Sequence, residues 1–167
     1  MKTNVSTIKA VITPEELLEH WQGHRALTRK VIEAFPEDDL FNFSVGGMRP
    51  FYGLVMEMID LAYYGLKGVT SNDWKEIDEM THSKGEMPAK NKAELLLLWD
   101  KVTEDIDRLW VNLEPEHFHY TTLAFGQYEG SVYSIILYWI DNEIHHRGQG
   151  YVYLRALGIT PPPFWER

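Results

Sequence analysis

Four long segments of this 167-residue chain carry helical periodicity, and prolines or glycines separate them. The segments run from Pro14 to just before Pro36, from Pro50 to Leu66, from Lys92 to Leu113 and from Ser131 to Leu157. Alternation of the strand type is nearly absent. Apolar residues recur every three to four positions, which suits helices packed side by side. We therefore predict an all-α protein, a four-helix bundle forming one domain over residues 1–167.

The ends of these segments carry recognisable signals. Thr13 before Pro14 and two acidic residues is a helix start, with threonine as the N-cap. Gly158, followed by three prolines, closes the last segment. Gly65 and Gly68 lie near the expected end of the second segment.

The stretches between the segments are less regular. Residues Val69 to Lys92 are polar and form the one long inter-helix connection, with room for a short helical turn near Asp73 to Glu79. Residues His117 to Gly130 are aromatic and rich in threonine, a composition compatible with a short extended piece.

Composition narrows the classes of partner. The formal net charge is −9 and the pI is near 5.2, so the overall field repels a phosphate backbone and we expect no nucleic-acid binding. The absence of cysteine excludes disulfides, thiolate metal sites and cysteine nucleophiles. The chain has neither a signal-peptide-like start nor the roughly 18 apolar residues of a membrane span. We expect no membrane association and a cytoplasmic location.

A polar cluster, residues 141–149, interrupts the otherwise apolar and aromatic stripe of the last segment. Buried polar groups need partners, so such a cluster suggests a site. Asn142 and His146 are i,i+4 neighbours and point the same way, which is how one helix presents two ligands to a metal. Glu57 lies on the apolar stripe of the second segment. If the two helices are neighbours, Glu57, Asn142 and His146 converge on a divalent metal.

Structural roles compete with this interpretation. His146 would serve equally as a hydrogen-bonded core histidine, and Glu57 could pair with an arginine such as Arg147. His20 and His24 repeat the i,i+4 spacing on the first segment and form a second metal candidate, although no acidic residue joins them convincingly.

The neighbours of His146 have candidate roles of their own. His145 is rotated by about 100° from His146, so the two do not share one metal on a regular helix. Together with Arg147 and Gln149 it is a candidate for supporting the ligands through hydrogen bonds. Glu143 could act as a base, although a solvent-facing carboxylate is the simpler interpretation. His117 and His119 fit a surface or loop-packing role.

Two motifs resemble a known family. The stretch Met48 to Ile59 resembles the start of the second helix of DinB/YfiT-like metalloproteins. His145-His146-Arg147-Gly148-Gln149, followed by a Leu-Arg-Ala-Leu-Gly string and a proline-rich tail, resembles the C-terminal signature of that family.

The resemblance implies a four-helix bundle, often a homodimer, that binds nickel or zinc through three histidines. One comes from the second helix and two, spaced i,i+4, from the last. Their positions hold Glu57, Asn142 and His146 here, so only His146 is retained. Glutamate binds metals well, whereas neutral asparagine is a poorer ligand for transition metals, so affinity falls or preference shifts towards a harder ion such as manganese.

Two functions stay open from the sequence. In the first, a metal activates a water or a thiol for transferase or hydrolase chemistry on a small molecule. In the second, the chain is a non-catalytic homodimer that has lost the metal and works as a small-molecule binder or an interaction scaffold.

Overall fold

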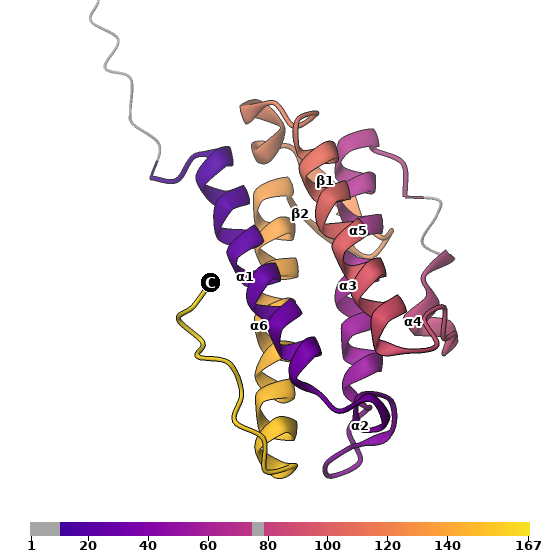
Figure 1. Ribbon diagram of the computed structural model, residues 1–167. Coiled ribbons are helices and arrows are strands. Elements are labelled where there is room, and N and C mark those ends of the chain that lie inside the picture. Colours follow the sequence, from indigo (N-terminus) through magenta and orange to yellow (C-terminus); the bar gives the residue numbers. More distant parts are fainter. Residues whose placement is uncertain (1–10, 75–78) are drawn as a thin grey trace, which may run out of the picture.

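The computed structural model describes residues 11–74 and 79–167, and four long helices form its body. They are α1 (Pro14–Ala34), α3 (Phe51–Ser71), α5 (Lys92–Trp110) and α6 (Val132–Ala156). α1 and α3 each pack against both α5 and α6, so α1 and α3 occupy opposite corners of the bundle. α1 and α6 run down the page in Figure 1, and α3 and α5 run up it. The predicted all-α four-helix bundle is confirmed.

Shorter elements lie in the connections. The helix α2 (Glu37–Asn42) follows α1, and α4 (Thr81–Lys84) lies in the long connection between α3 and α5. The turn expected near residues 73–79 falls largely outside the described residues. After α5 come the 3₁₀ helix η2 (Pro115–His119) and an antiparallel hairpin of β1 (Thr121–Ala124) and β2 (Tyr128–Ser131). The extended piece expected in this stretch is therefore present.

The predicted helix ends follow local chemistry. The backbone N–H of Glu16 donates to the Thr13 hydroxyl (3.2 Å) and the N–H of Thr13 donates to the Glu16 carboxylate (2.8 Å), a complete capping box. At the other end of the bundle, Gly158 adopts φ +76°, and Ile159 N–H bonds back to the carbonyl of Leu154 at 2.8 Å. This is the left-handed stop that the glycine predicted.

The helix α3 continues past the point where the glycines suggested an end. An added Cβ at Gly65 would lie 2.4 Å from Trp139 Cζ2 on α6, and one at Gly68 would lie 2.4 Å from Trp74. These glycines therefore allow large rings to approach the helix and do not end it. The helix stops instead at Asn72, which has a left-handed φ of 54°.

The core is aromatic as well as aliphatic. Its largest fully buried side chains include three tryptophans, and these are Trp21, Trp99 and Trp139. The indoles of Trp21 and Trp139 lie 6.4 Å apart between α1 and α6.

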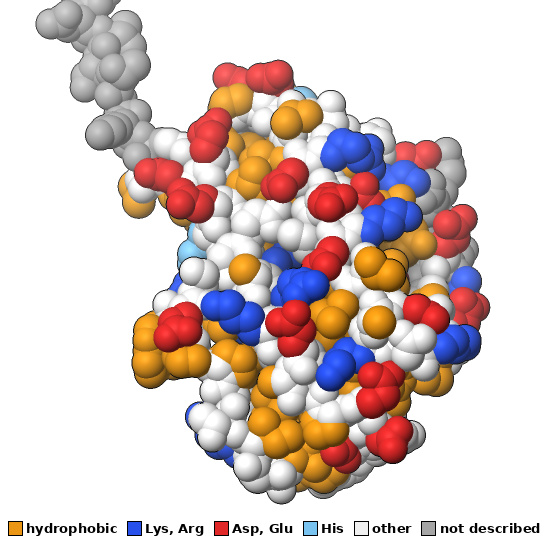
Figure 2. Space-filling model, in the orientation of Figure 1, with side chains coloured by type: hydrophobic (Ala, Val, Ile, Leu, Met, Phe, Trp, Pro, Cys, Tyr) orange, Lys and Arg blue, Asp and Glu red, His pale blue; other side chains and the backbone are white. Residues whose placement is uncertain are grey.

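Within the described residues, no helix combines the length and the apolar character that a membrane crossing requires. On the face shown in Figure 2, acidic and basic side chains are interspersed.

The turn of the hairpin carries a strained residue. Phe125 adopts φ 54°, a left-handed conformation that costs a side chain with a Cβ about 1–2 kcal/mol. Its ring lies 5.1 Å from Trp74, edge to face, and 6.3 Å from Trp139. The buried ring stabilises the strained backbone, and the hairpin thereby closes one end of the space between α3 and α6.

Candidate functional site

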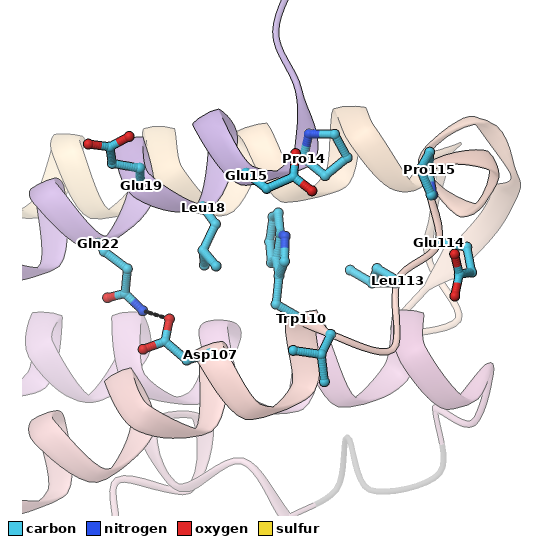
Figure 3. Close-up of a pocket in the computed structure, with 11 residues that line it drawn as sticks. Pro14, Glu15, Leu18, Glu19, Gln22, Asp107, Trp110, Leu113, Glu114 and Pro115 are labelled. Atoms are coloured by element: carbon cyan, nitrogen blue, oxygen red, sulfur yellow. Dashed lines mark hydrogen bonds between the residues drawn. The ribbon is translucent and has the colours of Figure 1, made fainter.

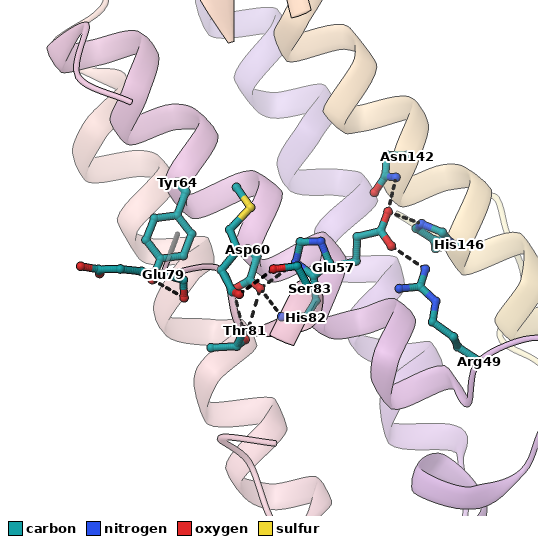
Figure 4. A network of polar contacts seen from close by, with 11 residues as sticks. Arg49, Glu57, Asp60, Tyr64, Glu79, Thr81, His82, Ser83, Asn142 and His146 are labelled. Carbon is teal, nitrogen blue, oxygen red and sulfur yellow. Dashed lines mark hydrogen bonds and ion pairs between the residues drawn. The ribbon is translucent and has the colours of Figure 1, made fainter. Parts of the chain in front are cut away.

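The three residues expected to converge do meet. Glu57 lies on α3, and Asn142 and His146 lie on the neighbouring α6. Asn142 Nδ2 donates to Glu57 Oε1 at 3.1 Å, and His146 Nε2 lies 3.0 Å from the same oxygen. Figure 4 shows both α6 side chains directed at the Glu57 carboxylate. The contacts are hydrogen bonds to the carboxylate itself.

A fourth residue, absent from the sequence-based site, completes this cluster. The guanidinium of Arg49, just before α3, lies 2.5 Å from Glu57 Oε2 (Figure 4). Burial alone would raise the pKa of Glu57. Hydrogen bonds from His146, Arg49 and Asn142 outweigh that effect and hold the pKa of this carboxyl well below its usual range. Glu57 is therefore an anion whose two oxygens both accept hydrogen bonds.

The expected supporting residues divide between two sites. Gln149 Oε1 lies 3.2 Å from His146 Nδ1, and Gln149 Nε2 lies 3.1 Å from His145 Nε2, so this pair backs His146 from the solvent side. Arg147 faces α1 instead, where it donates to the carbonyl of His24 at 3.1 Å and to the hydroxyl of Thr28 at 3.2 Å. The arginine that pairs with Glu57 is Arg49 and not Arg147.

Glu143 corrects the sequence-based expectation of a solvent-facing carboxylate. Its side chain is 2% exposed and its Oε1 accepts from Arg25 NH1 at 2.6 Å. Arg25 is fully buried, and its guanidinium carbon lies 3.8 Å from the centre of the Trp99 ring. Burial raises the pKa of Glu143, and the charge of Arg25 opposes that shift. The carboxylate of Glu143 faces the core and joins α6 to α1. His146, on the same turn of α6, faces Glu57 on α3 instead.

The second candidate metal pair lies in cationic surroundings. The imidazoles of His20 and His24 are 3.2 Å apart through their Nε2 atoms. Arg147 donates to His24 Nδ1 at 2.9 Å and Arg167 lies 3.2 Å from His24 Nε2. Burial and these neighbouring positive charges lower the pKa of His24 to about 3. Two guanidiniums beside the histidine oppose the binding of a metal cation there.

His117 has the loop-packing role expected from the sequence, since its Nδ1 accepts from the N–H of Glu114 at 3.2 Å.

A pocket of about 370 Å³ adjoins the Glu57 cluster. It lies between α3, α6 and the hairpin, and seven of the nine described side chains that line it are apolar or aromatic. They include Phe125, Tyr128, Tyr138 and Trp139. The two polar side chains among the nine are Glu57 and His82. A mostly apolar wall with a few polar groups is typical of small-molecule sites, and the volume lies within their usual range.

His82 is a site residue that sequence reasoning missed. Its Nδ1 lies 2.8 Å from Asp60 Oδ2, and its backbone N–H donates to the same oxygen at 2.8 Å. Asp60 is on α3, one turn after Glu57, and its side chain is 5% exposed (Figure 4). His82 follows Asp60 by 22 positions, which comprise the second half of α3 and part of the polar connection, so no helical spacing marks the pair. Only the tertiary fold brings them together.

A larger hollow, about 550 Å³, lies between the start of α1 and the end of α5. Its wall is rich in acidic groups, and Gln22 Nε2 donates to Asp107 Oδ1 across it at 2.7 Å (Figure 3). None of the residues expected to bind a metal lines it. The pocket beside Glu57 is therefore the candidate site.

The residues present do not fit a metal centre of the three-histidine type. Among the described residues, no group of three or more histidine, cysteine, aspartate or glutamate side chains could hold a metal ion. His146 Nε2 faces a carboxylate oxygen and so donates a proton where a metal needs a lone pair. Asn142 turns its NH₂ to Glu57, and its buried Oδ1 has no partner among the described residues. Arg49 already supplies the positive charge that a metal would supply.

Comparison with known proteins agrees with the fold. The architecture is a helical bundle with a polar cluster between its second and last long helices. A sequence model of the DinB family matches residues 1–167, and the chain belongs to this family. Among curated proteins no match is found.

Two solved structures share the fold. A DinB-like protein from Bacillus subtilis is 17% identical, with a TM-score of 0.70 over 91% of this chain and 99% of that one. A DinB-like protein from Bacillus cereus is 18% identical, with a TM-score of 0.73 over 90% of this chain and 97% of that one. At this identity the likeness concerns the fold alone.

Proposed function

We propose that this DinB-family protein binds a small molecule in the pocket beside Glu57, without a metal ion. The observation that carries the proposal is the ion pair of Glu57 with Arg49. It leaves the carboxylate saturated, with an apolar and aromatic pocket next to it. The function is that of a small-molecule binder, and metal-assisted transferase or hydrolase chemistry is the alternative that the experiments below distinguish.

Electrostatics support the metal-free proposal. A divalent ion at Glu57 Oε1 would have to displace the hydrogen bonds from Asn142 and His146. It would also lie close to the guanidinium of Arg49, and two like charges at such range repel. The guanidinium stabilises the half-buried carboxylate at a lower cost, because it is always charged and needs no dehydration of a metal ion.

Metal titration tests the first half of the proposal. Untagged protein purified without chelators should contain no stoichiometric metal, and nickel, zinc or manganese should leave its Tm unchanged. The double variant Glu57→His with Asn142→His restores three imidazoles, and its Tm should rise on adding nickel or zinc. Stoichiometric metal in the wild type that His146→Ala removes would contradict the proposal and support the metal-assisted alternative.

A pocket-filling variant tests the second half. Leu61 lines the pocket and is partly exposed, so Leu61→Trp adds a ring at the mouth with little strain. In a thermal-shift screen with small aromatic compounds, wild-type hits should lose their effect in Leu61→Trp. The matched control is Leu97→Trp on α5, at a position 69% exposed and outside the pocket, which should keep every hit. Hits that survive Leu61→Trp would show that they bind elsewhere.

A further inference from the structure

We propose that His82, oriented by Asp60, is the hydrogen-bond acceptor of the pocket, and that the ligand is a small neutral aromatic molecule carrying a hydroxyl group. The inference rests on the proposed binding function and specifies its ligand class. Three observations carry it: the paired geometry of Asp60 and His82, the position of His82 in the pocket wall, and the aromatic lining.

The carboxylate of Asp60 selects one tautomer of His82. Asp60 Oδ2 is 2.8 Å from His82 Nδ1 and can only accept, so Nδ1 carries the proton. The same carboxylate accepts from the backbone N–H of His82 and lies 3.2 Å from the Thr81 hydroxyl. These bonds hold the ring in place on the short helix α4. In the neutral imidazole, Nε2 is then a lone-pair acceptor.

The acceptor nitrogen is available to a ligand. His82 lines the 370 Å³ pocket and its side chain is 17% exposed, so the ring is neither sealed in the core nor free in solvent. Its hydrogen bonds with the other described residues use only Nδ1 and the backbone. A histidine that merely fastened α4 to α3 would need no place in the pocket wall.

The lining selects the rest of the ligand. Trp139 is 2% exposed and Phe125 is 9% exposed, and they form the inner wall, while Tyr128 and Tyr138 are 60% exposed and form the rim. Such rings favour a flat aromatic body. Among the described residues, no lysine or arginine lines the pocket whereas Glu57 does, which disfavours an anion. Arg49 already balances Glu57, so a cation is not required. A neutral body with one O–H donor satisfies both the rings and His82.

A pair of probes that differ only in the donor tests the inference. 2-Naphthol has the hydroxyl, and 2-methoxynaphthalene has the same rings without a donor. Titration of the untagged full chain near pH 7 should show 2-naphthol binding about five- to tenfold more tightly, the usual yield of one net hydrogen bond. His82→Phe should bring the ratio to about one and leave the affinity for the ether within about twofold.

Asp60→Asn and Asp60→Ala separate orientation from structure. Asparagine retains an oxygen that can accept from both His82 Nδ1 and the backbone N–H of His82, so the proton stays on Nδ1 and the preference for 2-naphthol should persist. Alanine removes that acceptor and leaves the tautomer of His82 unselected, so the preference should fall towards one while the affinity for the ether stays within about twofold. His82→Gln retains an acceptor oxygen and should keep part of the preference, which also serves if His82→Phe does not fold. The control His119→Phe, at an exposed position outside this pocket, should leave the ratio unchanged.

The outcomes distinguish the two proposals. Equal affinity of the wild type for both probes, or a preference that survives His82→Phe and Asp60→Ala, would overturn the role of His82 and leave the pocket intact. Binding of neither probe would overturn the ligand class and the aromatic pocket together.

Discussion

The buried pair of Arg25 and Glu143 should be the most sensitive polar contact in the bundle. The two side chains are 0% and 2% exposed, and NH1 lies 2.6 Å from Oε1. The remaining contacts of the guanidinium are to neutral acceptors, the Thr103 hydroxyl at 2.8 Å and the Trp99 carbonyl at 3.3 Å. Among the described residues, Glu143→Gln therefore removes the only counter-charge within hydrogen-bond distance and leaves the guanidinium in the core without a hydrogen-bonded carboxylate.

The expected loss follows from that isolation. Breaking a buried ion pair from one side costs about 3–5 kcal/mol, and the lower end applies because glutamine retains an acceptor oxygen. For a chain of this size, about 3 kcal/mol corresponds to a fall in Tm of roughly 6–12 °C. The free energy of unfolding is measured by urea denaturation followed through tryptophan fluorescence and circular dichroism.

A double-mutant cycle measures the interaction free energy between Arg25 and Glu143. The cycle compares Arg25→Met alone, Glu143→Leu alone and the two together. The double variant lacks both charges, so its stability should be close to or above that of the wild type, far from the sum of the two single losses. The control is Glu33→Gln, since Glu33 forms an exposed ion pair with Arg29 and should change stability by less than about 1 kcal/mol. A loss below about 1 kcal/mol in Glu143→Gln, or additive losses in the cycle, would show that water reaches the pair and refute the argument.

Two further predictions concern pH and packing. The pKa of His24 is lowered from 6.5 to about 3, so below pH 6.5 the unfolded chain binds a proton that the folded chain refuses. Stability should therefore fall by up to about 1.4 kcal/mol per unit as the pH drops from 6.5 towards 3, and His24→Gln should remove this slope in urea titrations between pH 7 and 5. Equal slopes in the two proteins would contradict the assignment. Gly65→Ala should cost about 1–3 kcal/mol, because its Cβ would meet Trp139 at 2.4 Å, whereas Gly148→Ala, with open space around it, should stabilise the protein by up to about 1 kcal/mol. Similar effects at both glycines in thermal denaturation would show that α3 and α6 are not closely packed at Gly65.

The helices could be predicted because their signals are local. The Thr13 N-cap, the glycine stop at Gly158 and the apolar period of each segment act within a few residues, and the structure reproduces each of them. The second segment was expected to end at Leu66, beside Gly65, but α3 continues to Ser71. A glycine near a helix end can mark either the end itself or the close approach of a side chain from another helix. Only the position of Trp139 on another helix distinguishes them.

The site was only half predictable for the same reason. Helical spacing placed Asn142 and His146 on one face, and the apolar stripe of α3 placed Glu57 opposite. Periodicity could not assign the remaining partners. Arg49 lies before α3 begins, and His82 lies on the short helix α4 within the long connection. The path of the chain between the long helices therefore brings Arg49 to Glu57 and His82 to the pocket.

The glutamate at position 57 and the arginine at position 49 are best understood together. The family resemblance implies a neutral imidazole at position 57, which would coordinate a metal ion through its lone pair. A carboxylate brings a negative charge into a half-buried site, and burial of that charge is unfavourable unless a cation joins it. Arg49 is that cation, placed by the turn before α3 and retained through a charge-assisted hydrogen bond. Replacing Arg49 by Met should therefore leave Glu57 short of a counter-charge and raise its pKa. If the argument is right, this variant, and not the wild type, is the one in which a divalent ion raises the Tm.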